Sequence, residues 1–407
     1  MDDSAKAQVA IPTGTGPRGI RYDFNDGARV LLPKGDWRVE LHDLDSGNVL
    51  FRTDIAEGMV TSTKKFYVRF GIRVWQKGKE KPDFSHDMEF AGKRVCVHFP
   101  VGTLGDILAW FPYVERFREI HGCQVSYTMA DEVAALFSAT YPNLHYVAFS
   151  EHDDFYASYR MGLFFDDSEN CMQPIDFRLV GLHRTAANIL GVDDAELPAK
   201  LKLDAPRIVE EPYVCIAVQA STQCKKWNNP TGWRDVIRHI KASGYRVLCI
   251  DREQFHGQVP AWQYCPPEAE DFTGNRPLGE RVALLQHASA FVGLSSGLAW
   301  LAWACRVPVV MISGFTLPFN EFRTPYRVFN IHTCTGCWND VRHRFDHKDF
   351  FWCPRHKGTN RQYECSALIT SHQVIRQFDR LLQDMKDGER CPDSAAHVTL
   401  ENEDRAA

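Results

Sequence analysis

The sequence lacks any run of about 18 apolar residues, the length that a membrane-spanning helix requires, so we expect no membrane span. Its first ten residues, MDDSAKAQVA, lack the basic and apolar regions of a secretion signal, which predicts a cytoplasmic location. The chain also has no surplus of positive charge, because its formal net charge is -5. This balance gives no general attraction to nucleic acid or to an anionic membrane, and we expect neither as a partner.

The composition is that of a globular protein with more than one core. At 407 residues the chain is long for a single hydrophobic core, which predicts two or three domains. Apolar residues make up 44% and charged residues 24%, as in globular proteins. In a reducing compartment the 13 cysteines are expected to be thiols or metal ligands rather than disulfides.

Two kinds of hydrophobic pattern divide the chain. Between about Gly19 and Asp87, short alternating runs separated by turn pairs predict a small antiparallel sheet or barrel. From Lys93 onward, apolar strands alternate with helices in two successive series, which predicts two Rossmann-like domains with a cleft between them. We therefore expect an α/β protein with an N-terminal β domain at 1–89, Rossmann-like domains at 90–206 and 207–390, an insert at 330–366 and a flexible tail at 391–407. Residues 1–18 are also expected to be mobile.

Four cysteines are clustered within 32 residues. They are Cys334, Cys337, Cys353 and Cys365, and they lie in a polar segment rather than in apolar strands. Four thiolates at such spacing favour a closed structural metal site, and the ligand type leaves both zinc and iron open. The alternative is a set of buried free thiols, which the sequence already places in strands at Cys96, Cys215 and Cys249.

A first candidate site follows the strand that begins near residue 94. A glycine loop, PVGTLGD, ends at Asp106 at the expected start of a helix. It is neither a Walker loop nor a G-x-G-x-x-G fingerprint. A carboxylate at the carboxyl end of a strand can accept the proton of an acceptor hydroxyl. The alternative is that Asp106 only caps the helix.

Two further polar segments follow strands of the second series. The segment 219–233 contains Lys225 and Lys226, whose charge suits a diphosphate; the alternative is a solvated loop. The turn at Ser295 and Ser296 begins an apolar helix, an arrangement that binds anions through free N–H groups. Plain capping of the helix by either serine is the alternative there.

Together these segments and the four cysteines resemble the heptosyltransferases of glycosyltransferase family 9, and more closely the bacterial autotransporter heptosyltransferases. The resemblance spans about residues 20–385 and implies a GT-B fold with two facing Rossmann-like domains. It implies inverting transfer of heptose from ADP-heptose to serine or threonine hydroxyls of an autotransporter adhesin passenger, with Asp106 as the general base. It also implies a structural iron at the four cysteines, with zinc as the alternative, and a large ring-shaped homo-oligomer, a dodecamer in the family.

The resemblance further implies a set of substrate-binding residues in four segments. Lys225 matches the lysine that faces the donor diphosphate, and Lys226 is the second choice. The expected substrate-binding residues are Thr103, Leu104, Gly105, Ser221, Thr222, Gln223, Lys225, Lys226, Asp271, Thr273, Gly274, Ser295, Ser296, Gly297 and Leu298. The segment 315–322 is expected at the cleft. Family members often carry an acidic residue in the serine turn, and this sequence has none there.

Two other functions remain as alternatives. One is a lipopolysaccharide-core heptosyltransferase, although that class lacks the N-terminal β module and the four-cysteine insert. The other is a non-catalytic assembly or nucleic-acid-binding protein built around a zinc ribbon, since the cysteine segment is locally basic.

Overall fold

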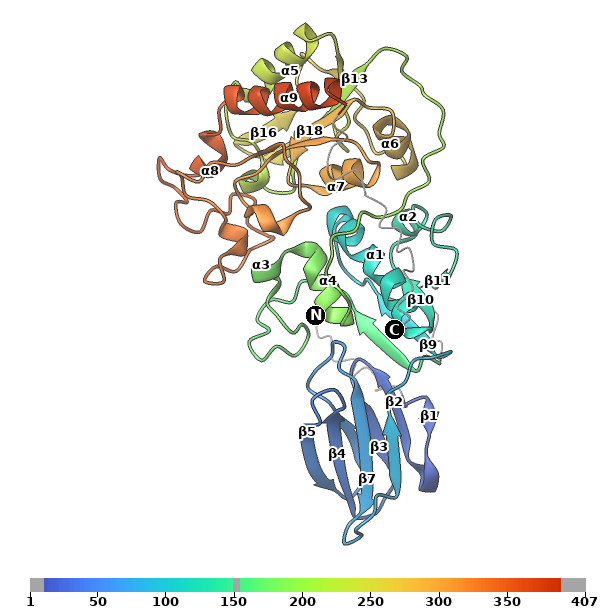
Figure 1. The fold of residues 1–407 in the computed structure, drawn as a ribbon. Helices are drawn as coiled ribbons and strands as arrows, with labels where there is room; N and C mark the ends of the chain where they lie inside the picture. Colours follow the sequence, from blue (N-terminus) through green and yellow to red (C-terminus); the bar gives the residue numbers. More distant parts are fainter. Residues whose placement is uncertain (1–10, 149–153, 389–407) are drawn as a thin grey trace, which may run out of the picture. The chain divides into compact units, whose positions relative to one another are not determined.

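The computed structural model describes residues 11–148 and 154–388 of the chain (Figure 1). The chain divides into two compact units, residues 1–200 and 201–407. Of the segments expected to be mobile, residues 1–10 and 389–407 lie outside the described residues, whereas residues 14–15 form a short paired strand. Among the described residues, no helix combines the length and the apolar character needed to cross a membrane.

The first unit contains the antiparallel sheet that the alternating pattern predicts. Its four strands pair in the order β5-β4-β7-β8, all antiparallel. Alternate residues of the central strands are fully buried, among them Val39, Leu41, Ile72 and Val74. The strands are β4 (Trp37–Asp43), β5 (Val49–Ile55), β7 (Phe70–Gln76) and β8 (Phe84–Asp87).

The same unit contains an eight-stranded mixed sheet. The order is β11-β10-β9-β12-β2-β3-β6, with β1 on β2; the pairs from β11 to β2 are parallel and the others antiparallel. A hydrogen-bonded sheet therefore crosses the boundary expected at residue 89. The strands are β1 (Gly14–Thr15), β2 (Arg21–Asn25), β3 (Arg29–Leu32), β6 (Gly58–Thr61), β9 (Arg94–His98), β10 (Gln124–Thr128), β11 (Leu144–Tyr146) and β12 (Ala157–Arg160).

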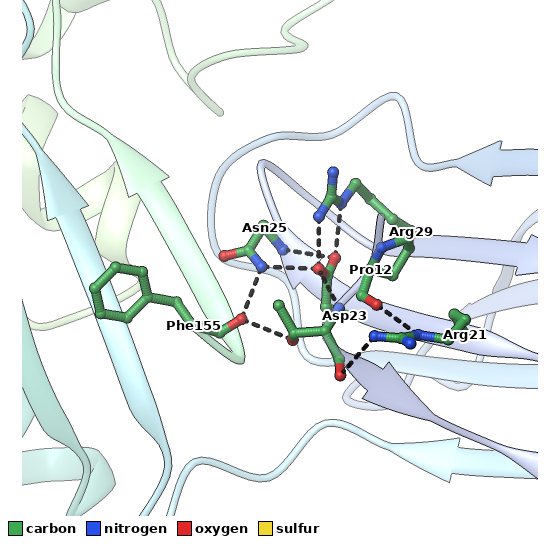
Figure 2. Close-up of polar contacts among 7 residues, drawn as sticks. Pro12, Arg21, Asp23, Asn25, Arg29 and Phe155 are labelled. Carbon is green, nitrogen blue, oxygen red and sulfur yellow. Dashed lines mark hydrogen bonds and ion pairs between the residues drawn. The ribbon is translucent and has the colours of Figure 1, made fainter. Parts of the chain in front are cut away.

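A buried carboxylate joins the N-terminal strands to the segment that leads into β12 (Figure 2). Asp23 is fully buried and accepts hydrogen bonds from Arg29 at 2.7 and 2.5 Å and from the side chain of Asn25 at 2.8 Å. The same Asn25 side chain donates to the carbonyl oxygen of Phe155 at 2.8 Å. A buried charge is tolerated only when it is paired and hydrogen-bonded, and Asp23 satisfies both conditions.

The helix α1 (Leu104–His121) confirms the helix expected after the first glycine loop. Its indole and phenol groups anchor it: Trp110 donates to the carbonyl oxygen of Leu182, and Tyr113 donates to that of Ala195, both at 3.0 Å. The helix continues through Pro112 and ends at Gly122, a left-handed cap. The other helices of the unit are η1 (Pro17–Gly19), α2 (Asp131–Ala134), α3 (Phe177–Val180) and α4 (Leu182–Leu190).

The second unit is built on a six-stranded parallel sheet. The order is β17-β14-β13-β18-β19-β20, and every pair is parallel. Strands buried on both faces read as continuous apolar runs, which is how β13 and β18 appear in the sequence. The strands are β13 (Tyr213–Ala217), β14 (Arg246–Cys249), β17 (Glu270–Asp271), β18 (Ala290–Leu294), β19 (Val309–Ile312) and β20 (Arg327–Val328).

Helices complete this unit and supply its core. The helices α5 and α9 run side by side next to the sheet (Figure 1). Their apolar side chains, including Val236, Ile240, Phe378 and Leu381, pack in one buried cluster with it. A small hairpin, β15 (Phe255–Gln258) with β16 (Ala261–Tyr264), stands apart from the parallel sheet. The helices are η2 (Gln223–Lys225), α5 (Gly232–Ala242), α6 (Leu278–Leu285), α7 (Gly297–Ala304), η3 (Pro318–Asn320), η4 (Cys337–Asn339), α8 (Glu364–Ala367) and α9 (Ser371–Lys386).

Candidate active site

Asp106 occupies the third position of α1, in the first unit. Its Oδ2 accepts hydrogen bonds from the backbone N–H and the hydroxyl of Thr103, at 2.7 and 2.9 Å. Thr103 is the N-cap, and the two residues form a capping box. Leu104 and Gly105 make up the turn between them. Asp106 therefore takes part in capping the helix, and this bonding holds the partly exposed carboxylate in a fixed orientation at the helix start.

Lys225 lies in a cage of three aromatic rings in the second unit. Its Nζ is 5.5 Å from the ring centroid of Phe315, 5.6 Å from that of Trp338 and 5.4 Å from that of Phe345. These distances are within the range of cation–π attraction. The sequence did not indicate this cage, because its rings come from segments far from Lys225 along the chain.

The neighbouring Lys226 is buried, with 1% of its surface exposed. Its Nζ donates a hydrogen bond to the carbonyl oxygen of His256 at 2.8 Å and lies 5.1 Å from the ring centroid of Phe350. Burial lowers the pKa of Lys226 to about 8, and the nearby Asp251 partly opposes this shift. Of the two lysines, Lys225 is the more exposed, and Lys226 is bonded inside the unit.

The other residues expected in this segment are mostly engaged within the protein. The N–H of Gln223 donates to the carbonyl oxygen of Phe350 at 3.0 Å, and the side chain of Gln223 donates to Asn228. The buried hydroxyl of Thr222 contacts the thiol of Cys224 at 3.2 Å, while Ser221 is exposed. The bond from Gln223 to Phe350 ties the lysine segment to the cysteine segment.

The serine turn carries a carboxylate that sequence reasoning missed. The hydroxyl of Ser295 donates to Oε1 of Glu321 at 2.5 Å, and Glu321 also pairs with Arg327 at 2.9 Å. Glu321 is 2% exposed and comes from the segment 315–322 that we expected near the cleft. Although the turn has no acidic residue of its own, Glu321 therefore supplies a carboxylate to it.

The start of α7 follows the same turn. Ser296 is the N-cap, and its Oγ is buried without a hydrogen-bond partner among the described residues. Gly297 and Leu298 form the first positions of the helix, where backbone N–H groups have no intrahelical acceptor. Capping by the Ser296 side chain, one alternative from the sequence, does not occur in this structure.

A buried arginine holds the loop at Asp271. Asp271 accepts hydrogen bonds from the N–H and hydroxyl of Thr273 at 2.9 and 2.5 Å. Arg281, 3% exposed, donates to the carbonyl oxygens of Gly274 and Asp251, both at 2.8 Å. The loop is thus fixed to the end of β14. Arg281 and Asp251 have no motif in the sequence that would have identified them.

Asp251 connects this loop to the lysine segment. Its carboxylate accepts hydrogen bonds from the N–H groups of Val218 at 2.8 Å and Gln219 at 3.2 Å. Burial raises the pKa of Asp251 to about 6, although these two bonds oppose the shift. The start of the segment 219–233 is therefore set by a buried carboxylate that lies just after β14.

The cysteine segment docks against the end of β19. The N–H of Gly336 donates to the carbonyl oxygen of Gly314 at 3.0 Å. A Cβ at Gly314 would lie 2.3 Å from the carbonyl oxygen of Cys365, so only glycine allows this approach. The N–H of Cys334 donates to Glu364 at 2.9 Å, and Arg355 contacts the thiol of Cys334 at 3.6 Å.

The donor set of this segment fits a thiolate-bound metal. Burial raises the pKa of Cys365, and the thiols of Cys337, Cys224, Cys353 and Cys334 raise it further, so these sulfurs influence one another electrostatically. Burial also raises the pKa of Cys337 to about 12, with Cys334 adding to the shift. A bound cation favours the thiolate form and would offset this mutual repulsion.

The four sulfurs do not, however, form a closed ligand group among the described residues. The group whose ligand atoms lie within 4.8 Å of one another is Cys334, His356 and Glu364. Hydrogen bonds from Arg361 and from the N–H of Cys334 lower the pKa of Glu364 to about 2. Coordination by four cysteines therefore stays a prediction, although their electrostatic contact is consistent with it.

Comparison with protein families defines the class. Residues 16–78 match the N-terminal domain of glycosyltransferase TibC, and residues 180–341 match glycosyltransferase family 9 (heptosyltransferase). The α/β fold with an N-terminal antiparallel sheet is thus that of a family 9 glycosyltransferase.

Individual relatives refine this class. The chain is 54% identical to the autotransporter heptosyltransferase BAHTCr of Citrobacter rodentium over 93% of each chain. It is also 54% identical to the autotransporter heptosyltransferase TibC of Escherichia coli H10407 over 91% of each chain. A crystal structure of dodecameric iron-containing TibC with ADP-D-beta-D-heptose matches with a TM-score of 0.90 and 53% identity, covering 92% of this chain and 98% of that one. The chain therefore belongs to the autotransporter heptosyltransferases.

One relative shows that membership does not guarantee activity. The inactive autotransporter heptosyltransferase BimC of Burkholderia thailandensis is 42% identical over 90% of this chain and 86% of that one. Whether this chain is active therefore depends on the residues of its own site.

Proposed function

We propose that this chain is an active protein O-heptosyltransferase that transfers heptose from ADP-heptose to serine or threonine hydroxyls of an autotransporter adhesin. The observation that carries this proposal is the match along 92% of the chain to a heptosyltransferase structure that holds an ADP-heptose. The oriented carboxylate of Asp106 at the start of α1 and the ammonium group of Lys225 in its aromatic cage supply a base and a cation of the kind that the transfer requires.

The reaction is a displacement with inversion at the anomeric carbon. The acceptor hydroxyl oxygen forms the new bond to the anomeric carbon while its proton passes to the carboxylate of Asp106. The bond from the anomeric carbon to the diphosphate oxygen breaks, and ADP leaves with the electron pair. The capping box with Thr103 orients the base before the acceptor arrives.

In this proposal the donor binds to the second Rossmann-like domain, which contains Lys225. Its ammonium group and the N-terminus of α7 would offset the diphosphate charge, with Ser296, Gly297 and Leu298 at the helix start. The hydroxyl of Ser295 donates its hydrogen bond to Glu321. Ser295 therefore contributes to the turn as a hydrogen-bond acceptor or through its backbone. The loop at Asp271, Thr273 and Gly274 would border the nucleotide.

A structural iron is part of the proposal. Cys334, Cys337, Cys353 and Cys365 would hold it as an insert in the second Rossmann-like domain, with zinc as the alternative ion. When bound, the metal cross-links the segment and stabilises it. We further propose a cytoplasmic enzyme that assembles into a ring-shaped dodecamer; the iron-containing relative is dodecameric.

The test offers two acceptors to the purified chain with ADP-heptose. An autotransporter passenger fragment should be glycosylated, and a lipopolysaccharide-core acceptor should not. Transfer only to the core acceptor would instead support the lipopolysaccharide alternative, which the match of residues 16–78 to the TibC N-terminal domain disfavours. No transfer to either acceptor, with nucleic-acid binding that falls steeply with salt, would support the zinc-ribbon alternative.

A further inference from the structure

The aromatic cage around Lys225 is made by the same segment that carries the metal-ligand cysteines. Two of its rings, Trp338 and Phe345, lie between Cys337 and Cys353 in the sequence, and Trp338 directly follows Cys337. The third, Phe315, follows Gly314, which contacts the backbone of Cys365. The cage and the cysteines therefore share one backbone framework.

The rings of the cage support one another. The centroids of Phe315, Trp338 and Phe345 are 5.4 to 5.6 Å apart. Trp352, which precedes Cys353, packs on Phe345 at 5.1 Å and on Phe315 at 6.0 Å. All four rings are buried, so their positions are set by packing rather than by solvent.

We propose that the metal-binding segment positions Lys225 for the donor diphosphate through this aromatic cage, so that Phe315, Trp338 and Phe345 are positioning residues for donor binding. This inference rests on the proposed function, which assigns the diphosphate to Lys225. A long lysine side chain has many rotamers, and restricting them before the donor arrives lowers the entropic cost of binding. The faces of the three rings attract the ammonium group and restrict it in this way.

The framework also gives the metal a role beyond stability. Loss of the ion would release Cys337 and Cys353, and with them Trp338 of the cage and Trp352, which packs on it. Lys225 would then lose its fixed position even while the parallel sheet remains folded. Metal content and donor affinity should consequently be coupled through the cage, of which Phe345 is one ring.

The test measures ADP binding by calorimetry on the full chain loaded with its metal. Phe345→Leu should raise the Kd for ADP roughly threefold to tenfold, the loss expected for a partly desolvated cation–π contact. Phe345→Tyr, which keeps a ring face, should stay within about twofold of the wild type. In transfer assays, Phe345→Leu should raise the KM for ADP-heptose while kcat is retained.

Matched controls separate positioning from folding. Phe378→Leu removes a similarly buried ring, which α9 contributes to the core of the second unit, and should leave the Kd for ADP unchanged. Phe345→Leu should bind as much metal as the wild type does. Its melting curve should show that it is as fully folded as the wild type at the assay temperature. Metal-depleted wild type should bind ADP at least as weakly as Phe345→Leu does, because depletion displaces Trp338 and Trp352 as well. Unchanged ADP binding after depletion would contradict the link between the metal and the cage.

The outcomes distinguish this inference from the function on which it rests. If Lys225→Met weakens ADP binding but Phe345→Leu does not, the cage has no positioning role and the inference is overturned. If the wild type binds no ADP, or Lys225→Met binds it as well as the wild type, the assignment of the donor lysine fails as well.

Discussion

The hydroxyl of Ser295 donates a hydrogen bond to Glu321, and Glu321 also forms an ion pair with Arg327 inside the second unit. Glu321→Gln removes the negative charge and leaves the Arg327 guanidinium buried without it. We expect the free energy of unfolding to fall by about 3 kcal/mol, because breaking one side of a buried ion pair is strongly destabilising. Urea unfolding of both proteins measures this change.

An exposed ion pair provides the control for that variant. Arg276 and Glu280 pair at 3.5 Å with both side chains about half exposed. Glu280→Gln should change the free energy of unfolding by less than about 0.5 kcal/mol. Equal effects of the two substitutions would show that Glu321 contributes no more than a surface charge.

The observed capping contact of Asp106 and its proposed role as general base predict effects of different size for one substitution. Asp106→Ala should abolish transfer, a loss of about 10²-fold or more for a general base, while ADP binding is retained. It should also cost about 1 kcal/mol of stability through loss of the capping box. The control is Thr370→Ala, which removes the similar capping box of α9 and should reduce stability without affecting transfer. Retained glycosylation by Asp106→Ala would rule out the base assignment.

Removal of the metal should first affect stability and assembly. Chelation, or Cys353→Ser, should lower the melting temperature and dissociate the oligomer, because the binding energy of a structural metal is folding energy. Cys215→Ala, at a buried thiol in β13, should leave the metal content unchanged. Metal analysis, thermal scans and size measurements test this, and a metal-free protein with unchanged melting temperature and size but no turnover would contradict it.

The pKa of Lys226 predicts a pH dependence of stability. The pKa is about 8 in the folded protein, against about 10.4 for an unfolded lysine. Between these pH values Lys226 is protonated in the unfolded chain and neutral in the folded chain, so the free energy of unfolding rises with pH. Below this window Lys226 is protonated in both states and adds no pH dependence. Urea unfolding at several pH values should show this rise in the wild type and not in Lys226→Met. A parallel dependence in both proteins would contradict the shifted pKa.

The sequence predicted the helices and strands better than it predicted which strands pair with one another. Alternation indicated β4, a continuous apolar run indicated β18 and helical spacing indicated α1, because burial of one face or both dictates which residues are apolar. Within the alternating region the strand β7 begins at Phe70, since the N–H of Tyr67 just before it bonds to the carbonyl oxygen of Ile189. Alternation reveals a strand but not its partner, so the pairing of β2 with β12 was not foreseen.

The site shows the same limit. Asp106, Lys225 and the serine turn lie in segments that follow strands, and that local rule made them candidates. Glu321, Asp251 and the ring of Phe345 act through contacts with residues distant in sequence, and no local motif marks them. Their roles follow from burial and pairing, which only the folded chain displays.

The most direct test of the proposed activity is the intact mass of an autotransporter passenger fragment co-expressed with this chain. The account predicts a mass increase of one heptose for each modified site with the wild type, and no increase with Asp106→Asn, whose amide keeps an acceptor for the cap but cannot take the proton. An unmodified passenger with the wild type, or equal modification with both proteins, would contradict it.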